Sequence, residues 1–339
     1  MKKTIFLFVM SLALFMTSCK SNHFSPSGTI YECLLVCDES VKPMVYEVMS
    51  APMPALPQEE GYFKMSFVQP WKFDDQLKGT RNILLVDINA GKYTVAKAVK
   101  GRNVWSTPQA YVRVQAPSVE AFQEFWETNG EQIREWFVRE ELARQIQFYQ
   151  SDMNDKARGK LNQRGYTMNI PASYMLLKDT VLKANGRQVH VLWTCDNSGS
   201  MRRDVLEYDY PYTSRNQFSN DSIIAMRNAV MGQLVSAKAK DNSYMSTECK
   251  YEMPESRYVA PLRDTTGGFY AMETRGLWRM ENGISMGGPF VCLTRLDQVN
   301  ARVVTAETFI YAPGQKKRNE LRKAEAILYT LKMPNERKK

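Results

Sequence analysis

The chain has 339 residues, a formal net charge of +9 and two histidines, His23 and His190. So few histidines exclude a histidine-rich zinc site, and only His190, in the strand-like run QVHVLW, is placed to serve a Ser-His-Asp or Cys-His apparatus. A structural strand histidine is the better interpretation. The sequence also lacks a phosphate-binding loop, a dinucleotide glycine fingerprint, a G-x-S-x-G elbow and an S-x-x-K motif, so no cofactor is expected.

The first residues predict export to the cell envelope. Two lysines precede an almost unbroken apolar run, and Cys19 follows two small residues. This order is typical of a lipoprotein signal peptide, residues 1–18, which is cut before a cysteine that carries the lipid. Met16 stands where leucine is commonest, so an ordinary signal peptide cut near Ser18 stays as the alternative.

Residues 19–29 are predicted to form a polar, lipidated tether, and ten residues reach about 35 Å at most. Lys20 directly follows Cys19, where an aspartate would indicate inner-membrane retention. We therefore expect a lipid-anchored protein on the periplasmic face of the outer membrane. Removal of two signal lysines lowers the net charge from +9 to +7, which permits contact with anionic lipids or glycans. Nucleic acid is not an expected partner.

A first domain of mixed α/β type is predicted over residues 30–153. The apolar runs 30–37 and 82–88 are typical of strands covered on both faces. A helix is expected over 39–50. The remaining elements are predicted in the order strand 62–69, short helix 73–78, and strands 92–99 and 109–116.

Two helices are expected to end this domain. Ser118 opens the first, and Asn129-Gly130 is predicted to break it before a second helix over 131–153. The polar, glycine-containing segment 154–166 is predicted to be the linker between domains.

An antiparallel α+β sandwich is predicted over residues 167–333, followed by a basic tail at 334–339, so the fold class of the whole chain is α+β. In this domain the sequence predicts, in order, a bent strand at 167–177, strands 188–195 and 203–210, a helix at 220–236, a run of strands over 244–311 and a last helix at 316–332.

Five cysteines remain besides the lipidated one, so at least one is expected to be free or to pair between chains. Cys33 and Cys37 lie about 13 Å apart if both are in one strand, too far for a disulfide, and are interpreted as small buried hydrophobic residues. The pairing among these two and Cys195, Cys249 and Cys292 stays open.

The segment LWTCDNSGSM contains Asp196, Ser198 and Ser200 in a D-x-S-x-S order after an apolar run. That order resembles the metal-ion-dependent adhesion site of von Willebrand factor A domains, in which a helix follows. Here the alternation in residues 203–210 predicts a strand instead. Asn-Ser-Gly-Ser between two strands is ordinary hairpin chemistry, so a turn is favoured over a metal site.

Other candidates have structural alternatives. Arg275, Trp278 and Arg279 approach a glycine-rich turn and form a candidate ligand surface, because Arg and Trp are frequent in recognition surfaces. The alternative is a hairpin turning at 281–283 with Trp278 in the core. The acidic pairs Glu59-Glu60 and Asp74-Asp75, and the basic helix face formed by residues 316–318, Arg322 and Lys323, are interpreted as solvated surface, although that basic face is also suited to lipid headgroups.

Five stretches together resemble an uncharacterised family of Bacteroidetes lipoproteins, a domain of unknown function: APMPALPQEE, RNILLV, VWSTPQ, RGLWRM…MGGPFVCLT and YAPGQKKRNELRKAEAILY. The resemblance covers nearly the whole mature chain. It implies a secreted, lipid-anchored protein and defines no functional residues. The second domain also looks like the sandwich of photosystem-associated and Ran-binding small proteins, which is a likeness of fold alone.

The main functional hypothesis is a non-enzymatic, lipid-anchored accessory protein that binds an envelope protein or glycan. The alternative is an envelope hydrolase that uses carboxylates in a cleft between the domains, and convergent acids with raised pKa values would favour it. A metal-dependent adhesion-type binder is the weaker third hypothesis.

Overall fold

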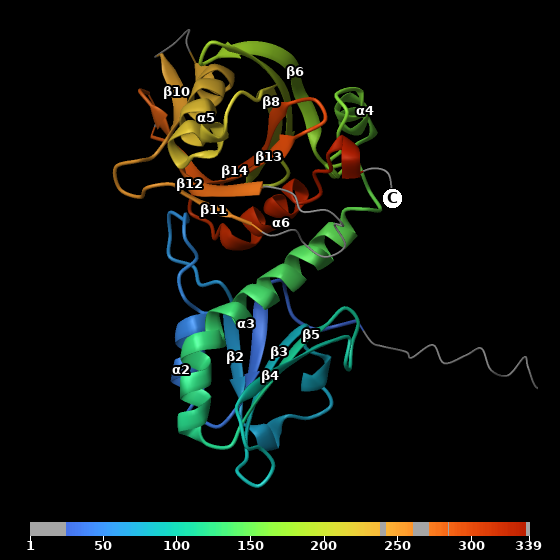
Figure 1. Cartoon of the computed structure of the whole chain (residues 1–339), viewed down its shortest axis with the longest axis vertical. Coiled ribbons are helices and arrows are strands. Elements are labelled where there is room, and N and C mark those ends of the chain that lie inside the picture. Colours follow the sequence, from blue (N-terminus) through green and yellow to red (C-terminus); the bar gives the residue numbers. More distant parts are fainter. Residues whose placement is uncertain (1–24, 238–241, 260–270, 284, 337–339) are drawn as a thin grey trace, which may run out of the picture.

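The computed structural model describes residues 25–237, 242–259, 271–283 and 285–336. Cys19 and the signal peptide lie outside these residues. Within them, the chain forms two lobes joined by one long helix (Figure 1). No helix in the described ranges is long and apolar enough to cross a membrane.

The first lobe is a mixed sheet with helices on one face, which confirms the predicted α/β type. Its strand order is β2-β1-β3-β5-β4, with parallel pairs except for β4, which runs antiparallel at the edge. The elements are β1 (Glu32–Val36), α2 (Lys42–Met49), β2 (Lys64–Val68), 3-10 turns η1 (Pro70–Lys72) and η2 (Leu77–Gly79), β3 (Asn82–Ile88), β4 (Lys97–Arg102), β5 (Ala110–Ala116) and α3 (Val119–Phe148).

The central strands β1 and β3 are buried because α2 and α3 cover one face of the sheet and a smaller cluster of side chains covers the other. Cys33 and Cys37 are buried and free, as predicted, and Cys195 and Cys292 are buried too, whereas Cys249 is exposed. The strand expected at 92–99 instead begins at Lys97.

Helix α3 is continuous over 30 residues, so the predicted break at Asn129-Gly130 is wrong. A Cβ at Gly130 would lie 2.9 Å from the indole of Trp126, which shows that the glycine makes room for this side chain within the helix. The Asn129 side chain donates to the Phe125 carbonyl at 2.9 Å. Ser118 caps the helix as predicted, since its hydroxyl accepts from Ala121.

The segment expected as a linker, 154–166, contains helix α4 (Asp155–Gln163), whose Ala157 and Leu161 are buried. Asn154 caps it by accepting from Ala157 at 2.9 Å. The connection is therefore helical and partly packed, although its composition is polar.

The second lobe is an antiparallel sheet flanked by helices, as predicted. Its strand order is β6-β7-β8-β14-β13-β12-β10-β9, and β11 also pairs with β12. The elements are β6 (Met175–Ala184), β7 (Arg187–Asp196), β8 (Arg202–Pro211), η3 (Arg215–Phe218), α5 (Asn220–Leu234), β9 (Ser236–Ala237), β10 (Ser243–Thr247), β11 (Glu255–Tyr258), β12 (Ala271–Glu281), β13 (Gly287–Asp297), β14 (Arg302–Tyr311), α6 (Arg318–Leu328) and η4 (Pro334–Glu336).

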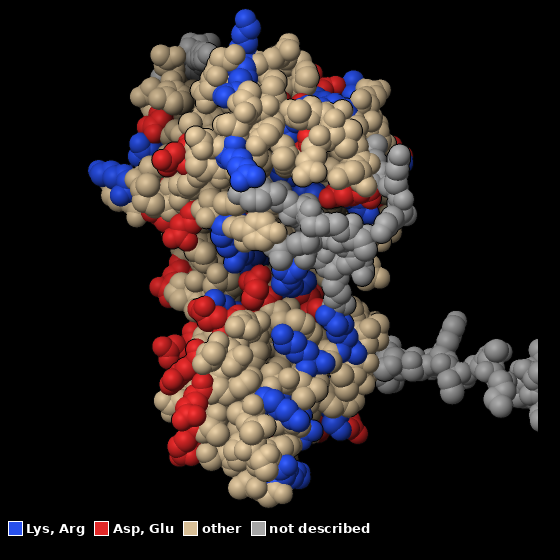
Figure 2. Space-filling view, in the orientation of Figure 1, with Lys and Arg blue, Asp and Glu red and all other residues tan. Residues whose placement is uncertain are grey.

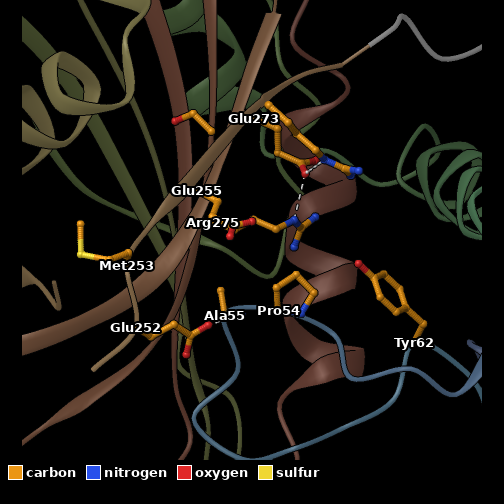
Figure 3. A pocket seen from close by; sticks show the side chains of 10 residues that line it. Pro54, Ala55, Tyr62, Glu252, Met253, Glu255, Glu273 and Arg275 are labelled. Atoms are coloured by element: carbon orange, nitrogen blue, oxygen red, sulfur yellow. Dashed lines mark hydrogen bonds and ion pairs between the residues drawn. The ribbon is translucent and has the colours of Figure 1, made fainter. Parts of the chain in front are cut away.

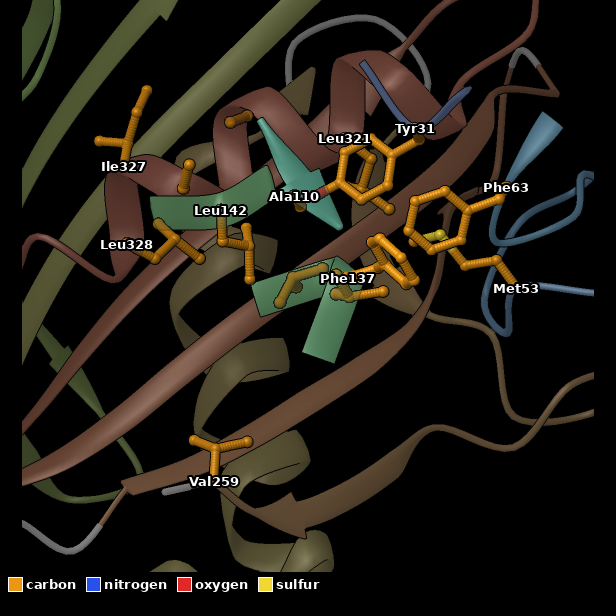
Figure 4. Close-up of a cluster of buried hydrophobic side chains, with 14 of the residues drawn as sticks. Tyr31, Met53, Phe63, Ala110, Phe137, Leu142, Val259, Leu321, Ile327 and Leu328 are labelled. Atoms are coloured by element: carbon orange, nitrogen blue, oxygen red, sulfur yellow. The ribbon is translucent and has the colours of Figure 1, made fainter. Parts of the chain in front are cut away.

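Helices α5 and α6 cover opposite faces of this sheet, and α6 also contacts α3. Phe137 and Leu142 of α3 and Leu321 and Leu328 of α6 belong to one hydrophobic cluster that includes Phe63 of the first lobe (Figure 4). The two lobes therefore share a core. The start of the predicted basic tail also packs, because Glu336 pairs with Arg295.

Candidate functional site at the inter-domain seam

The D-x-S-x-S segment forms the turn between the antiparallel strands β7 and β8. Asp196 accepts the backbone N–H of Ser198 at 3.0 Å, and its other oxygen lies 3.5 Å from Arg203 Nη1. Ser200 Oγ accepts from Gln315 at 2.6 Å. Both carboxylate oxygens of Asp196 are thus used within the turn. In the part of the chain that the structure describes, no three His, Cys, Asp or Glu side chains gather to hold a metal.

The trio Arg275, Trp278 and Arg279 is not brought together. Successive side chains of a strand point to opposite faces, so Trp278 points away from Arg275. Trp278 is buried, and its Nε1 donates to the Ile310 carbonyl at 3.2 Å. Arg279 pairs with Glu281 and Glu248 at the end of β12. Only Arg275 reaches the boundary between the lobes.

That boundary, here called the inter-domain seam, lies between residues 50–62 and α3 of the first lobe and β11, β12 and α6 of the second. Glu60 Oε1 accepts the backbone N–H groups of Lys317 at 2.6 Å and Arg318 at 3.2 Å. Arg318 Nη1 donates to the Gly61 carbonyl at 2.9 Å. The expectation that Glu60 is solvated surface acid is therefore wrong, because the carboxylate caps the start of α6.

The predicted basic face of the last helix is wrong for the same reason. Lys317, Arg318 and Arg322 are buried against the first lobe, whereas Lys316 is exposed and Lys323 is partly exposed. Both interpretations of that face, solvated surface and headgroup contact, require exposure, and three of its five residues are buried.

A network of buried charges runs through the seam. Glu273 accepts from Arg275 and from Arg257, each at 2.9 Å, and from the Tyr329 hydroxyl at 2.6 Å. Arg275 also pairs with Glu325 of α6, which accepts from Arg322 at 3.0 Å. These contacts link β11 and β12 to α6.

The arginines hold the carboxylate of Glu273 ionised. Burial alone would raise its pKa, but Arg275 and Arg257 outweigh burial and keep the pKa of Glu273 well below its usual range. Burial and the two carboxylates raise the pKa of Tyr329 well above its ordinary value, so its hydroxyl keeps its proton and donates. Nη1 of Arg275 is buried without a hydrogen-bond partner.

A cavity of about 330 Å³ opens beside this network (Figure 3). Its charged lining consists of Glu252, Glu255, Arg257, Glu273 and Arg275. The rest of the lining includes Pro54, Ala55, Tyr62 and Met253, so both lobes contribute. Glu252 is tied to the first lobe, since it accepts the Ala55 N–H at 2.7 Å.

The carboxyls whose pKa burial raises, Glu140, Asp204, Glu207 and Glu307, line none of the described cavities. Burial raises the pKa of Glu207 to about 8, and Glu207 and Asp209 both accept from the Tyr166 hydroxyl, at 2.5 and 2.7 Å. This pair lies inside the second lobe and lines none of the described cavities. His190 lies on the same sheet, with Nδ1 3.4 Å from Asp209, and remains half-exposed as the strand interpretation predicted.

Comparison with protein families gives two matches. Residues 26–150 match a domain of unknown function, DUF8532, and residues 153–330 match another, DUF4837, over more than half of the chain. The chain belongs to the DUF4837 family. This confirms the expected resemblance to a family of unknown function. No curated protein matches the sequence.

The seam is where these two family regions meet. The DUF8532 region supplies residues 50–62 and the whole of α3, and the DUF4837 domain supplies β11, β12 and α6. Sequence reasoning assigned Glu60 to solvated surface and missed Glu273, Glu325 and Tyr329. The resemblance rests on five stretches, and three of them meet at the seam: those beginning APMP, RGLW and YAPG. They are far apart in the sequence, so only the folded structure shows that they meet.

Proposed function

We propose that this chain is a lipid-anchored accessory protein of the cell envelope that binds an envelope protein at the inter-domain seam and catalyses no reaction there. The observation that supports it best is the 330 Å³ cavity with a charged lining held from both lobes. Charges that are already fixed lose little freedom on binding, so more of the contact energy appears as affinity.

The residue types at the cavity suit a protein partner. Arginine, tyrosine and methionine are enriched in interfaces, and Met253 at the rim is 64% exposed. Arg257 offers a half-exposed guanidinium and Glu255 an exposed carboxylate, so a peptide segment with groups of both signs fits this lining. Chemistry by acid and base is less favoured, since Arg275 and Arg257 keep Glu273 ionised.

The anchor in this proposal is Cys19, on the periplasmic face of the outer membrane. It is supported by the order of charged, apolar and small residues before Cys19. Inhibition of the lipoprotein signal peptidase should cause the precursor to accumulate. Normal processing during inhibition would mean that the anchor is absent and that an ordinary signal peptide is cut instead.

A photo-crosslinking residue placed at Met253 tests the seam in cells. We expect it to capture a discrete envelope protein, and to lose it when Cys19→Ala removes the anchor. The matched control is the same probe at Val299, which is 62% exposed in the β13–β14 turn, away from the seam. Equal capture at both positions, or none at native expression, would argue against binding at the seam. Capture of a glycan and no protein would contradict the proposal that the partner is a protein.

An envelope hydrolase is the second candidate, because three carboxylates line the cavity: Glu252, Glu255 and Glu273. Of these three, the Glu255 side chain forms no hydrogen bond or ion pair with the described residues and is exposed, so it is the best placed to reach a substrate. Hydrolysis of a glycan or peptide by the wild type that disappears in Glu255→Gln would favour this candidate over the binding protein.

A further inference from the structure

The edge of the first lobe carries an unbalanced run of charge. Between Asp87 and Glu120 the sequence has five basic residues and no acidic one. These residues are Lys92, Lys97, Lys100, Arg102 and Arg113. Two of them are neutralised within the fold, since Arg102 pairs with Glu140 and Arg113 with Asp87.

The lysines of the edge strand β4 are left without such partners. Lys97 and Lys100 form no ion pair with any carboxylate of the described residues. Lys100 lies 5.8 Å above the ring of Trp136 on the helix side of the sheet, and alternation places Lys97 and Val99 on the other side. The cationic groups therefore flank the strand edge on both faces. Val99, between these lysines, and Val95, just before the strand, are exposed.

The described end of the tether lies close to the end of this edge strand. Ser27 donates its N–H to the Gly79 carbonyl at 2.9 Å and pairs with Thr80 ahead of β3. The Gln109 side chain donates to the Thr80 carbonyl at 2.7 Å, and the Gln109 backbone pairs with Asn103 at the end of β4. In Figure 1 the described chain starts on the β5 side of the sheet, away from α2.

The distance to the membrane is then limited by the tether. Cys19 precedes Ser27 by eight residues, and eight residues span about 28 Å at most. A lipid on Cys19 would hold Ser27, and with it the basic edge, within that distance of the headgroups. The Debye length at physiological salt is about 8 Å, so the lysines attract anionic headgroups only when the basic edge comes within about that distance of them.

Charge is also distributed unevenly over the first lobe. Figure 2 shows Lys and Arg on the side where the described chain starts, and Asp and Glu on the opposite side. The first turns of α3 contribute Glu120, Glu124, Glu127 and Glu131. An anionic surface would attract one side of the lobe and repel the other.

We propose that the β4 edge, defined by Lys97, Lys100 and the exposed Val95 and Val99, docks on the anionic headgroups of the leaflet that holds the Cys19 lipid. This docking rests on the lipid anchor of the proposed function. It fixes which side of the first lobe faces the membrane and leaves the second lobe with its seam projecting into the periplasm. Each lysine close to an anionic leaflet contributes about 1 kcal/mol of attraction, which orients a lobe that the lipid already holds nearby.

Vesicle flotation tests this surface without relying on the lipid. The mature chain with Cys19→Ala is mixed with vesicles of phosphatidylethanolamine and phosphatidylglycerol, or of phosphatidylcholine alone. We expect binding to the anionic vesicles that weakens as salt rises. Lys97→Gln with Lys100→Gln should weaken the binding about fivefold for each lysine, and so about 25-fold for the pair.

The matched control is Lys156→Gln with Lys332→Gln, which removes the same charge from exposed positions of the second lobe. An equal loss in this control would mean that net charge alone drives binding, and would overturn the proposal. So would absence of binding by the Cys19→Ala chain with its lysines intact, which would leave the signal-peptidase result untouched. Lysines on edge strands also prevent aggregation. If the β4 variant only aggregates by size-exclusion chromatography and binds vesicles as before, the edge is protective and not a membrane contact.

Discussion

The contact between Glu60 and α6 predicts how firmly the two lobes are joined. Loss of a side-chain cap costs about 0.5–2 kcal/mol, and loss of a negative charge at a helix N-terminus costs about 0.3–1 kcal/mol. Glu60→Ala removes both, so we expect a loss of about 1–3 kcal/mol in the free energy of unfolding. Glu60→Gln keeps an oxygen that accepts the N–H groups of Lys317 and Arg318, and it should lose only the smaller part.

Urea unfolding followed by tryptophan fluorescence measures this change, and hydrogen exchange at the first turn of α6 locates it. Glu59→Ala is the matched control, because Glu59 is exposed next to Glu60, and it should stay within about 0.5 kcal/mol of the wild type. If Glu60→Ala behaves like Glu59→Ala in both measurements, the carboxylate does not hold the lobes together and the seam is weaker than its geometry indicates.

Two further predictions concern the second lobe. The pKa of Glu207 is raised to about 8, so the native state binds a proton that the unfolded state releases near pH 4.5. Its stabilising contribution is present below about pH 4.5 and is lost as the pH rises to about 8; Glu207→Gln should flatten that fall in urea midpoints, and an unchanged slope would refute the assignment. Gly288→Ala should destabilise by about 1–3 kcal/mol or more, since its Cβ would lie 2.1 Å from the Ile310 carbonyl oxygen. The same change at Gly159, in α4 with open space around it, should be neutral or stabilising in urea unfolding, and equal losses at both glycines would contradict the packing argument.

Periodic apolar patterns made most of the fold predictable. The strands at 188–195 and 203–210 and the helix at 220–236 lie within a few residues of β7, β8 and α5, because each buries one continuous apolar face. The predicted break at Gly130 was wrong because it rested on the low helix propensity of glycine. Within α3 this glycine leaves the space that the Trp126 side chain occupies.

Buried charge was the part that sequence could not show. In residues 203–210, Glu207 and Asp209 alternate with apolar residues, which predicts a strand but suggests that the acids face solvent. Here both faces of the sheet are covered, and Tyr166 and Arg164 come from a distant segment to pair with Glu207. The predicted ligand surface of Arg275 and Trp278 was wrong for a related reason. Their spacing puts them on opposite faces of β12, and the partners of Arg275 include Glu325 of α6, which is distant in the sequence.

The seam also constrains what a partner can do to this protein. Helix α3 continues from the first lobe into the shared core, and Glu60 and Glu252 each accept a backbone N–H across the seam. A wide hinge opening would therefore have to break these contacts together with the hydrophobic cluster around Phe137. A partner that binds without such opening must use the cavity as it stands, and its affinity should then depend on side chains at the rim, such as Met253 and Arg257, more than on movement of the lobes.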